Sequence, residues 1–202
     1  MTKTLSTLHP GTLQRWYEDL CRIRYQTLRQ LVNPGLTGLR PAILPAKGAV
    51  YCFWWTGDLE LLRTHGCNRH IELPGPGKRL VAIHFDDEWL GITARLPIPL
   101  YVGKTADSLT KRVGQHLRIK AQRATARFTG ARKQDRPTTS CQLRAGVEHL
   151  FPEMADTRAL VLDNVGLSFV VLHGDDHAAN RFYLEDLAVG LMRPPLNIDI
   201  ER

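Results

Sequence analysis

The sequence has few of the features that mark secreted or membrane proteins. Its four cysteines, Cys21, Cys52, Cys67 and Cys141, lie far apart and form no CxxC pair, so the spacing indicates no disulfide framework. No apolar run approaches the roughly 20 residues of a membrane span. The N-terminal segment MTKTLSTLHP lacks the apolar core of a signal peptide. We therefore expect a soluble, cytoplasmic protein with reduced thiols and no membrane partner.

Acidic residues are outnumbered, and the imbalance is local. Lys and Arg number 27 against 20 Asp and Glu, which gives a net charge of +7 and an isoelectric point near 9.5. Between Lys104 and Arg136, ten Lys or Arg are opposed only by Asp107 and Asp135, a net of +8. Such a tract is often just a solvated basic face, but excess positive charge also captures polyanions. Nucleic acid is the first partner to expect.

The composition excludes a disordered or fibrous chain. Hydrophobic residues make up 43% and charged residues 23%, both near the averages of globular proteins. A length of 202 residues suits one compact α/β domain with elaborations. We expect residues 1–47 to form an N-terminal helical extension and linker. Residues 48–202 would form the main domain, with a Gly- and Pro-punctuated insertion at 56–95.

The spacing of apolar residues predicts a mixture of strands and helices. Strands are expected over 48–55, 80–85, 98–103, 159–162 and 167–172. Helices are expected over 12–32, from a cap at Asp107 or Ser108 onward, over 142–150, and from Asp175 or Asp176 to the prolines at 194 and 195. The apolar positions of the last helix are Phe182, Leu184, Leu187, Leu191 and Met192.

Side chains capable of chemistry recur at the ends of these elements. One predicted strand carries Tyr51, and another ends in Tyr101-Val102-Gly103-Lys104 and turns into a helix bearing Arg112 and His116. At positions i and i+4, the Arg and the His share one helix face and can reach one phosphate together. Taken singly, such tyrosines are usually half-buried aromatics, and an R-x-x-x-H pair is commonly on the surface. Only the combination is informative.

In this combination the sequence resembles the GIY-YIG nuclease superfamily. The two name-giving motifs correspond to Ala49-Val50-Tyr51 and Tyr101-Val102-Gly103. The Arg and the His that follow the second motif in the family correspond to Arg112 and His116. Its later Glu on a helix and its Asn after a turn correspond to Glu185 in FYLEDLAVGL and Asn197 in RPPLN.

The resemblance covers residues 48–55, 98–118 and 167–198, with two departures from the family pattern. Ala49 stands where the first motif has Gly, and 50 residues separate Tyr51 from Tyr101, where compact members have far fewer. The resemblance implies an α/β (α+β) fold with a small mixed or antiparallel sheet flanked by helices. The N-terminal helix and the insertion between the motif strands would be additions to that core.

The resemblance also implies a metal-dependent phosphodiester hydrolase. Glu185 would hold one divalent cation, Mg²⁺ or Mn²⁺, through oxygen. Arg112 would bind phosphate oxygens through its planar fork and oppose the charge that grows in the transition state. Asn197 would orient a loop or the substrate.

Water is the expected nucleophile, deprotonated by Tyr51 or Tyr101. Tyr51 is the favoured base, with Tyr101 hydrogen-bonding to phosphate or water. Because a phenol with a pKa near 10 is a poor base, the phenolate needs support from Lys104, Arg112, the metal or His116. His116 would take a proton from Tyr51 or orient it.

The expected function is a restriction-type endonuclease acting on duplex DNA. A homodimer would suit a palindromic site. The same catalytic residues also admit a nuclease acting on single-stranded DNA or RNA, or a nucleic-acid-binding module without catalysis. Backbone contacts are assigned to the basic residues Lys111, Arg118, Lys120, Arg123, Arg127, Arg132, Lys133 and Arg136.

Overall fold

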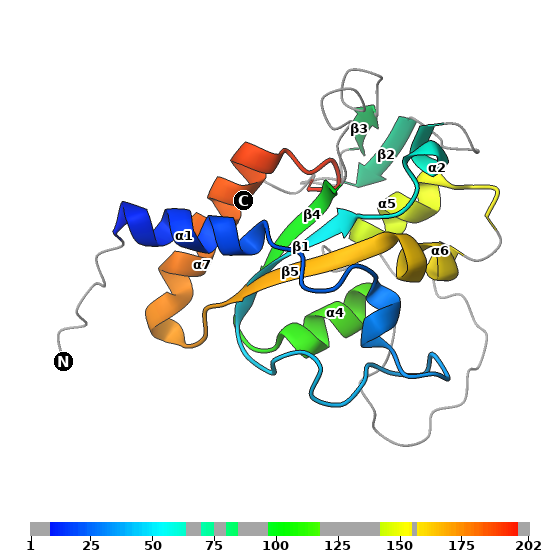
Figure 1. Ribbon diagram of the computed structural model, residues 1–202. Helices are drawn as coiled ribbons and strands as arrows, with labels where there is room; N and C mark the ends of the chain where they lie inside the picture. Colours follow the sequence, from blue (N-terminus) through cyan, green and yellow to red (C-terminus); the bar gives the residue numbers. More distant parts are fainter. Residues whose placement is uncertain are drawn as a thin grey trace.

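A three-stranded antiparallel sheet lies at the centre of the computed structural model, which describes residues 9–63, 70–74, 80–84, 97–117, 142–154 and 157–197. The strands are β1 (Ala49–Trp55), β4 (Ile98–Thr105) and β5 (Val165–Val171), in the order β4-β1-β5. Helices flank the sheet (Figure 1). The α+β fold predicted from the sequence is confirmed.

The central strand β1 is buried along its whole length because both faces of the sheet are covered. Val50, Cys52 and Trp54 pack in one cluster with residues of α1 (Pro10–Leu20) and α7 (Ala178–Met192). The alternate side chains of β1 pack in the main core on the other face. That face is covered by α4 (Leu109–Leu117), α5 (Gln142–Leu150) and α6 (Thr157–Asn164). A strand buried on two faces has a continuous apolar sequence, as GAVYCFWW does.

Strand register brings the two motif tyrosines together. Tyr51 pairs with Gly103, and Phe53 pairs with Tyr101, before an irregularity between Phe53 and Trp54. Side chains two residues apart point to the same face of a strand. Tyr51 and Tyr101 are therefore diagonal neighbours across two adjacent strands.

The insertion between the motif strands contributes a separate two-stranded sheet. It contains the short helix α2 (Leu59–Arg63) and the antiparallel pair β2 (His70–Pro74) and β3 (Leu80–His84). The predicted strand at 80–85 is confirmed as far as His84, and residue 85 lies outside the described residues. β2 was not predicted, because HIELP alternates polar and apolar residues over only four positions before Pro74, within a segment punctuated by Gly and Pro.

The predicted N-terminal helix over 12–32 is wrong in its extent. α1 ends at Leu20, and a separate 3₁₀ helix, η1, covers Leu28–Leu31. Between them, the backbone N–H groups of Arg24 and Tyr25 donate to Leu167 O at 3.0 and 3.1 Å. Leu167 N–H donates back to Tyr25 O at 2.9 Å. Pairing with the edge strand β5 thus replaces the helical hydrogen bonds that the apolar spacing suggested.

The predicted strand at 159–162 is also wrong, because this segment belongs to α6. Leu160, Val161 and Leu162 are all buried in the helix, and Asn164 Nδ2 donates to Leu160 O at 3.0 Å. A short apolar run suits a buried helix as well as a strand, so periodicity alone does not separate them. The helix leads straight into β5, the strand predicted at 167–172.

The buried face of the last helix matches the predicted one only in part. It follows a 3₁₀ turn, η4 (Asp175–His177), and Phe182 and Leu191 are 49% and 58% exposed. Leu184 is buried as predicted, Met192 packs partly buried against the same cluster, and the other buried residues of α7 are Asn180, Arg181 and Ala188. Over the described part of the chain, no helix has the length and apolar character needed to cross a membrane.

Candidate active site

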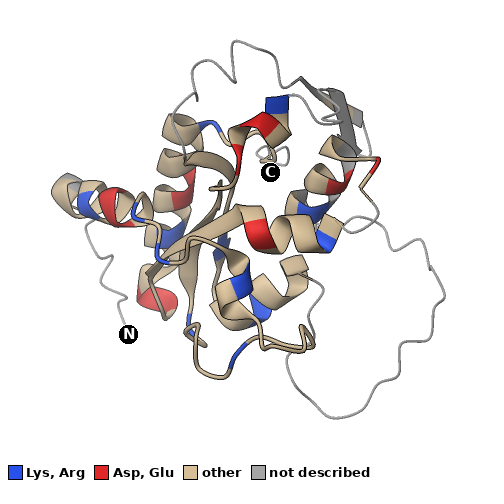
Figure 2. Ribbon diagram, turned by 45° about the vertical axis from the view of Figure 1, so that its right-hand side comes forward, with Lys and Arg blue, Asp and Glu red and all other residues tan. Residues whose placement is uncertain are grey.

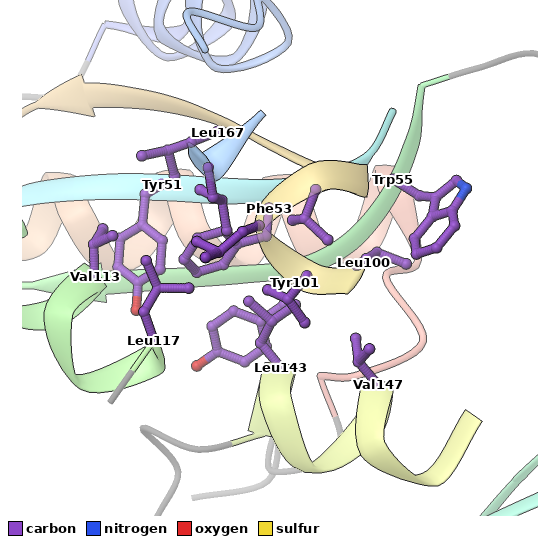
Figure 3. Close-up of a cluster of buried hydrophobic side chains, with 14 of the residues drawn as sticks. Tyr51, Phe53, Trp55, Leu100, Tyr101, Val113, Leu117, Leu143, Val147 and Leu167 are labelled. Carbon is purple, nitrogen blue, oxygen red and sulfur yellow. The ribbon is translucent and has the colours of Figure 1, made fainter. Parts of the chain in front are cut away.

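Tyr51 and Tyr101 lie side by side on one face of the sheet, with ring centroids 6.3 Å apart. Both side chains are buried, at 0% and 5% exposure. Their rings extend from the strands toward α4 and α5, where Leu117 and Leu143 pack beside them (Figure 3). The two predicted phenols therefore share one pocket of the core instead of lying on separate surfaces.

The Tyr51 hydroxyl joins the sheet to α4 through two hydrogen bonds. His116 Nε2 lies 2.9 Å from Tyr51 Oη, and Arg112 Nε donates to the same oxygen at 3.2 Å. Ser108 caps this helix, accepting from Lys111 N at 3.3 Å. One turn of helix separates Arg112 from His116, so the shared face predicted from their spacing is the face that meets Tyr51.

His116 is a neutral imidazole within this cluster. Its side chain is 1% exposed, and burial lowers its pKa to about 3, with the charges of Arg112 and Arg144 acting in the same direction. Because Arg112 already donates to Tyr51 Oη, the phenolic proton is free to be donated to Nε2 of the neutral ring. Nδ1 has no hydrogen-bond partner among the described residues. His116 Nε2 thus accepts the hydrogen bond of the Tyr51 hydroxyl, whereas the lowered pKa disfavours lasting protonation of the ring.

Both phenols are held in their protonated form. Burial raises the pKa of Tyr51 and of Tyr101, and the negative charge of Glu185 adds to that increase. Arg112 opposes it at both residues, through its charge and through hydrogen bonding. Arg112 is therefore the group in this cluster that favours a phenolate.

Glu185 reaches the site from α7 on the other side of strand β4. Its carboxylate forms an ion pair with Lys104, and the two side chains are 18% and 40% exposed. Lys104 Nζ also lies 5.3 Å from the ring centroid of Phe182. Since the charge of Glu185 acts on the pKa of both motif tyrosines, the structure brings the carboxylate and the phenols together. The edge strand β4 is the element that they share.

Asn197 is committed to the backbone of β4. Its Oδ1 accepts from Val102 N at 2.7 Å, and its Nδ2 donates to Val102 O at 2.7 Å. Leu196 N donates to Leu100 O at 3.1 Å, which extends this pairing along the edge. Asn197 therefore orients the segment after α7 against the strand that carries Tyr101, in line with its expected positioning role.

The glycine of the second motif is required by close packing. A Cβ atom on Gly103 would lie 2.6 Å from Tyr51 Oη and 2.8 Å from Tyr101 Cε1. In the first motif, Ala49 is accommodated without exposure to solvent. The close approach there falls one residue earlier, where a Cβ on Gly48 would lie 2.4 Å from Ala106 O.

Sequence reasoning missed one charged residue near this site, Arg144 on α5. It is 8% exposed, and its charge acts on His116. Its Nε lies 3.2 Å from Glu148 Oε1 on the same helix. The signal that could have revealed it is helical spacing, because Arg144 lies three and seven residues before the buried Val147 and Phe151.

The predicted nucleic-acid contacts are largely untested by the structure. Lys111 is exposed on α4. The other seven basic residues, at 118, 120, 123, 127, 132, 133 and 136, lie outside the described residues. Within the described part, basic and acidic residues are interspersed over the helices (Figure 2).

The donor set is compatible with a single hard cation. The described residues contain no group of three or more His, Cys, Asp or Glu side chains that could hold a metal. Mg²⁺, by contrast, keeps several waters and is bound through one or two carboxylates plus phosphate. Glu185, half-buried and beside the phenols, fits that pattern. A cation bound there must compete with Lys104 for the carboxylate.

A comparison of the chain with known protein families and with curated proteins finds no match. The function is accordingly inferred from the site itself.

Proposed function

We propose that this protein is a cytoplasmic, metal-dependent endonuclease of the GIY-YIG type that hydrolyses phosphodiester bonds in duplex DNA. The observation that carries the proposal is the hydrogen-bonded cluster of Tyr51, Arg112 and His116 beside the Lys104–Glu185 pair. These residues are far apart in the sequence and converge at the edge strand β4. A buried tyrosine held between a cation and a neutral imidazole is an arrangement suited to proton transfer.

Arg112 supports binding and catalysis at the phosphate. Tyr51 engages its Nε, and hydrogen bonding to Tyr101 also acts on the guanidinium, while the remaining N–H groups of the planar fork can contact phosphate oxygens. No ion pair neutralises Arg112 within the described residues. Its charge is thus available to a phosphate whose own charge increases in the transition state.

Tyr51 and His116 together provide the route for a proton. As the attacking water loses a proton to Tyr51 Oη, the phenolic proton passes transiently to His116 Nε2, 2.9 Å away, and the low pKa of that imidazole favours its prompt release. The water oxygen forms the new bond to phosphorus while the bond to the leaving ribose oxygen breaks, and the leaving oxygen takes up a proton from solvent water. Tyr101 beside them can hydrogen-bond to the water or to a phosphate oxygen. A divalent cation bound at Glu185 would supply Lewis acidity at the phosphate.

The test is cleavage of supercoiled plasmid by wild type, Glu185→Gln and Asp186→Asn, each with Mg²⁺ and with chelator. Asp186 is the matched control, because it is an exposed acid on the same helix. Wild type and Asp186→Asn should nick the plasmid only with Mg²⁺, and Glu185→Gln should be inactive. DNA binding by wild type without nicking in either condition would instead identify a non-catalytic binding module.

Two further measurements refine the proposed substrate and assembly. Discrete fragments from linear duplex DNA would establish restriction-type specificity, whereas cleavage confined to single-stranded DNA or to RNA would select the alternative substrate. Light scattering of the protein with and without a duplex would test the homodimer that a palindromic site favours.

A further inference from the structure

Arg144 is a buried cation with unused hydrogen-bonding capacity. Its side chain is 10% exposed, and neither Nε nor Nη1 has a hydrogen-bond partner within the described residues. Glu148 Oε1 lies 3.2 Å from Nε, but the direction of the N–H bond does not make it a hydrogen bond, and Glu148 is 43% exposed. Leaving buried charged donors unpaired costs free energy. A buried cation of this kind is more readily retained where a bound ligand accepts the hydrogen bonds that the protein leaves unmade.

The surroundings of Arg144 are those of the candidate active site. α5 packs against α4, which carries Arg112 and His116, and against β4, which carries Tyr101. The charges of Arg144 and Arg112 both act on the buried His116. Since His116 is neutral and Glu185 is paired with Lys104, this side of the site has two positive charges and no facing carboxylate among the described residues other than the peripheral Glu148. It is therefore selective for an anion.

We propose that Arg144 is a second phosphate-binding residue, which together with Arg112 holds a phosphate of the nucleic-acid backbone at this site. The inference rests on the proposed function and extends it by a residue that the family resemblance does not supply. A phosphate provides several acceptor oxygens for the free nitrogens of Arg144 and for the terminal nitrogens of Arg112. Two guanidinium groups on adjacent helices would fix the phosphate more rigidly than one.

The experiment compares Arg144→Gln and Arg144→Lys with wild type, using Arg22→Gln as the control. Arg22 is an exposed arginine just after α1 and pairs with Asp19 on that helix, so its substitution removes the same charge outside α4 and α5. Binding of a fluorescent duplex DNA is measured in chelator over a range of salt concentrations. Cleavage of supercoiled plasmid is measured with Mg²⁺. In parallel, inorganic phosphate is titrated into each protein and the thermal midpoint is measured. This titration separates a site for free phosphate from a site for the DNA backbone.

Loss of a phosphate contact has a signature that a purely structural role would not produce. The slope of log affinity against log salt should fall by about 0.9 in Arg144→Gln and stay unchanged in Arg22→Gln and in Arg144→Lys, which keeps the charge. The cleavage rate should drop roughly ten- to hundredfold in Arg144→Gln, the factor for a hydrogen bond to a charged group. Arg144→Lys should be slower than wild type because it lacks the planar fork.

The thermal midpoint provides a second discriminating readout. Because Arg144→Gln removes an unpaired buried charge, its midpoint should equal or exceed that of wild type, whereas a residue retained only for stability would lower it. If Arg144→Gln does not fold, Arg144→Lys decides alone, and wild-type cleavage by that variant overturns the proposal. An unchanged salt slope in folded Arg144→Gln also overturns it. If wild type binds DNA without cleaving it and Arg144→Gln still lowers the slope, the phosphate site stands while the nuclease proposal fails.

Discussion

The side-chain amide of Asn197 pairs with the backbone of Val102 in both directions, accepting from its N–H and donating to its carbonyl oxygen at 2.7 Å each. This is the hydrogen-bonding pattern of a neighbouring strand, supplied by one side chain to the edge strand β4 beside the Leu196–Leu100 backbone hydrogen bond. It ties the segment after α7 to the strand that carries Tyr101.

Asn197→Asp should destabilise the protein more than Asn197→Ala. The aspartate still accepts from Val102 N–H, but it sets a second acceptor against Val102 O, so an unfavourable contact replaces a hydrogen bond. The free energy of unfolding in urea should fall by about 1–3 kcal/mol for the aspartate variant, the cost of an unsatisfied buried group. Equal stability of the aspartate variant and wild type would contradict this pairing.

Gly103→Ala should damage the site more than the fold. The added methyl group would lie 2.6 Å from Tyr51 Oη, so the phenol must move away from His116 or Arg112. We expect at least a tenfold loss in plasmid cleavage, because a displacement of about 1 Å at a reacting group has effects of this size. Near-ultraviolet circular dichroism should report the shifted tyrosine.

Gly190→Ala is the matched control for that substitution. Gly190 lies on α7 with open space where a Cβ would be placed. Alanine there should leave cleavage unchanged and stabilise the helix by about 0.5–1 kcal/mol. A Gly103→Ala enzyme as active as Gly190→Ala would show that the position of the Tyr51 hydroxyl does not matter for cleavage.

The elements that the sequence predicts best are those whose residue pattern is compatible with only one kind of secondary structure. β1 and β4 are dense in apolar and aromatic residues, and α5 was predicted with its observed bounds. Tyr25 shows the limit, because helical spacing around it is overridden by backbone pairing with Leu167, a partner 142 residues later. The run at 159–162 was misassigned because its apolar residues suit a buried helix and a buried strand equally.

The sequence predicted which residues make up the candidate site, but not which of them contact one another. Spacing placed Arg112 and His116 on one face, yet it gave no means of knowing that both meet Tyr51 Oη. The pair between Lys104 and Glu185 joins positions 81 residues apart, and Arg144 resembles any charged residue of an amphipathic helix. Contacts between distant segments depend on packing, which no local pattern encodes.

His116 should make stability depend on pH below neutrality. Its folded pKa of about 3 lies below the ordinary histidine value of 6.5, so the unfolded chain binds a proton first as the pH falls. The stability contributed by neutral His116 is fully present above pH 6.5 and is lost as the pH falls toward the folded pKa. Over that range the free energy of unfolding falls by up to about 1.4 kcal/mol per pH unit. Urea unfolding between pH 7 and 4 should show this slope in wild type beyond that of His116→Gln. Parallel curves for the two proteins would show that His116 is not buried in its neutral form.

Lys104 should compete with the metal for Glu185. A cation that binds the carboxylate must displace the ammonium group, so removing the lysine charge removes that competition. Lys104→Gln is expected to raise the affinity for Mn²⁺ about two- to fivefold, as for a partly exposed ion pair of up to about 1 kcal/mol. Binding is measured by electron paramagnetic resonance without DNA.

Two further variants make the metal measurement specific. Lys47→Gln, at another exposed lysine, removes the same charge and should leave the Mn²⁺ affinity near the wild-type value, whereas Glu185→Gln should abolish binding. If Lys104→Gln instead binds Mn²⁺ more weakly than wild type, the lysine supports the metal site instead of competing with it. The metal would then bind beside an intact Lys104–Glu185 pair, and Glu185 would hold it through water instead of directly.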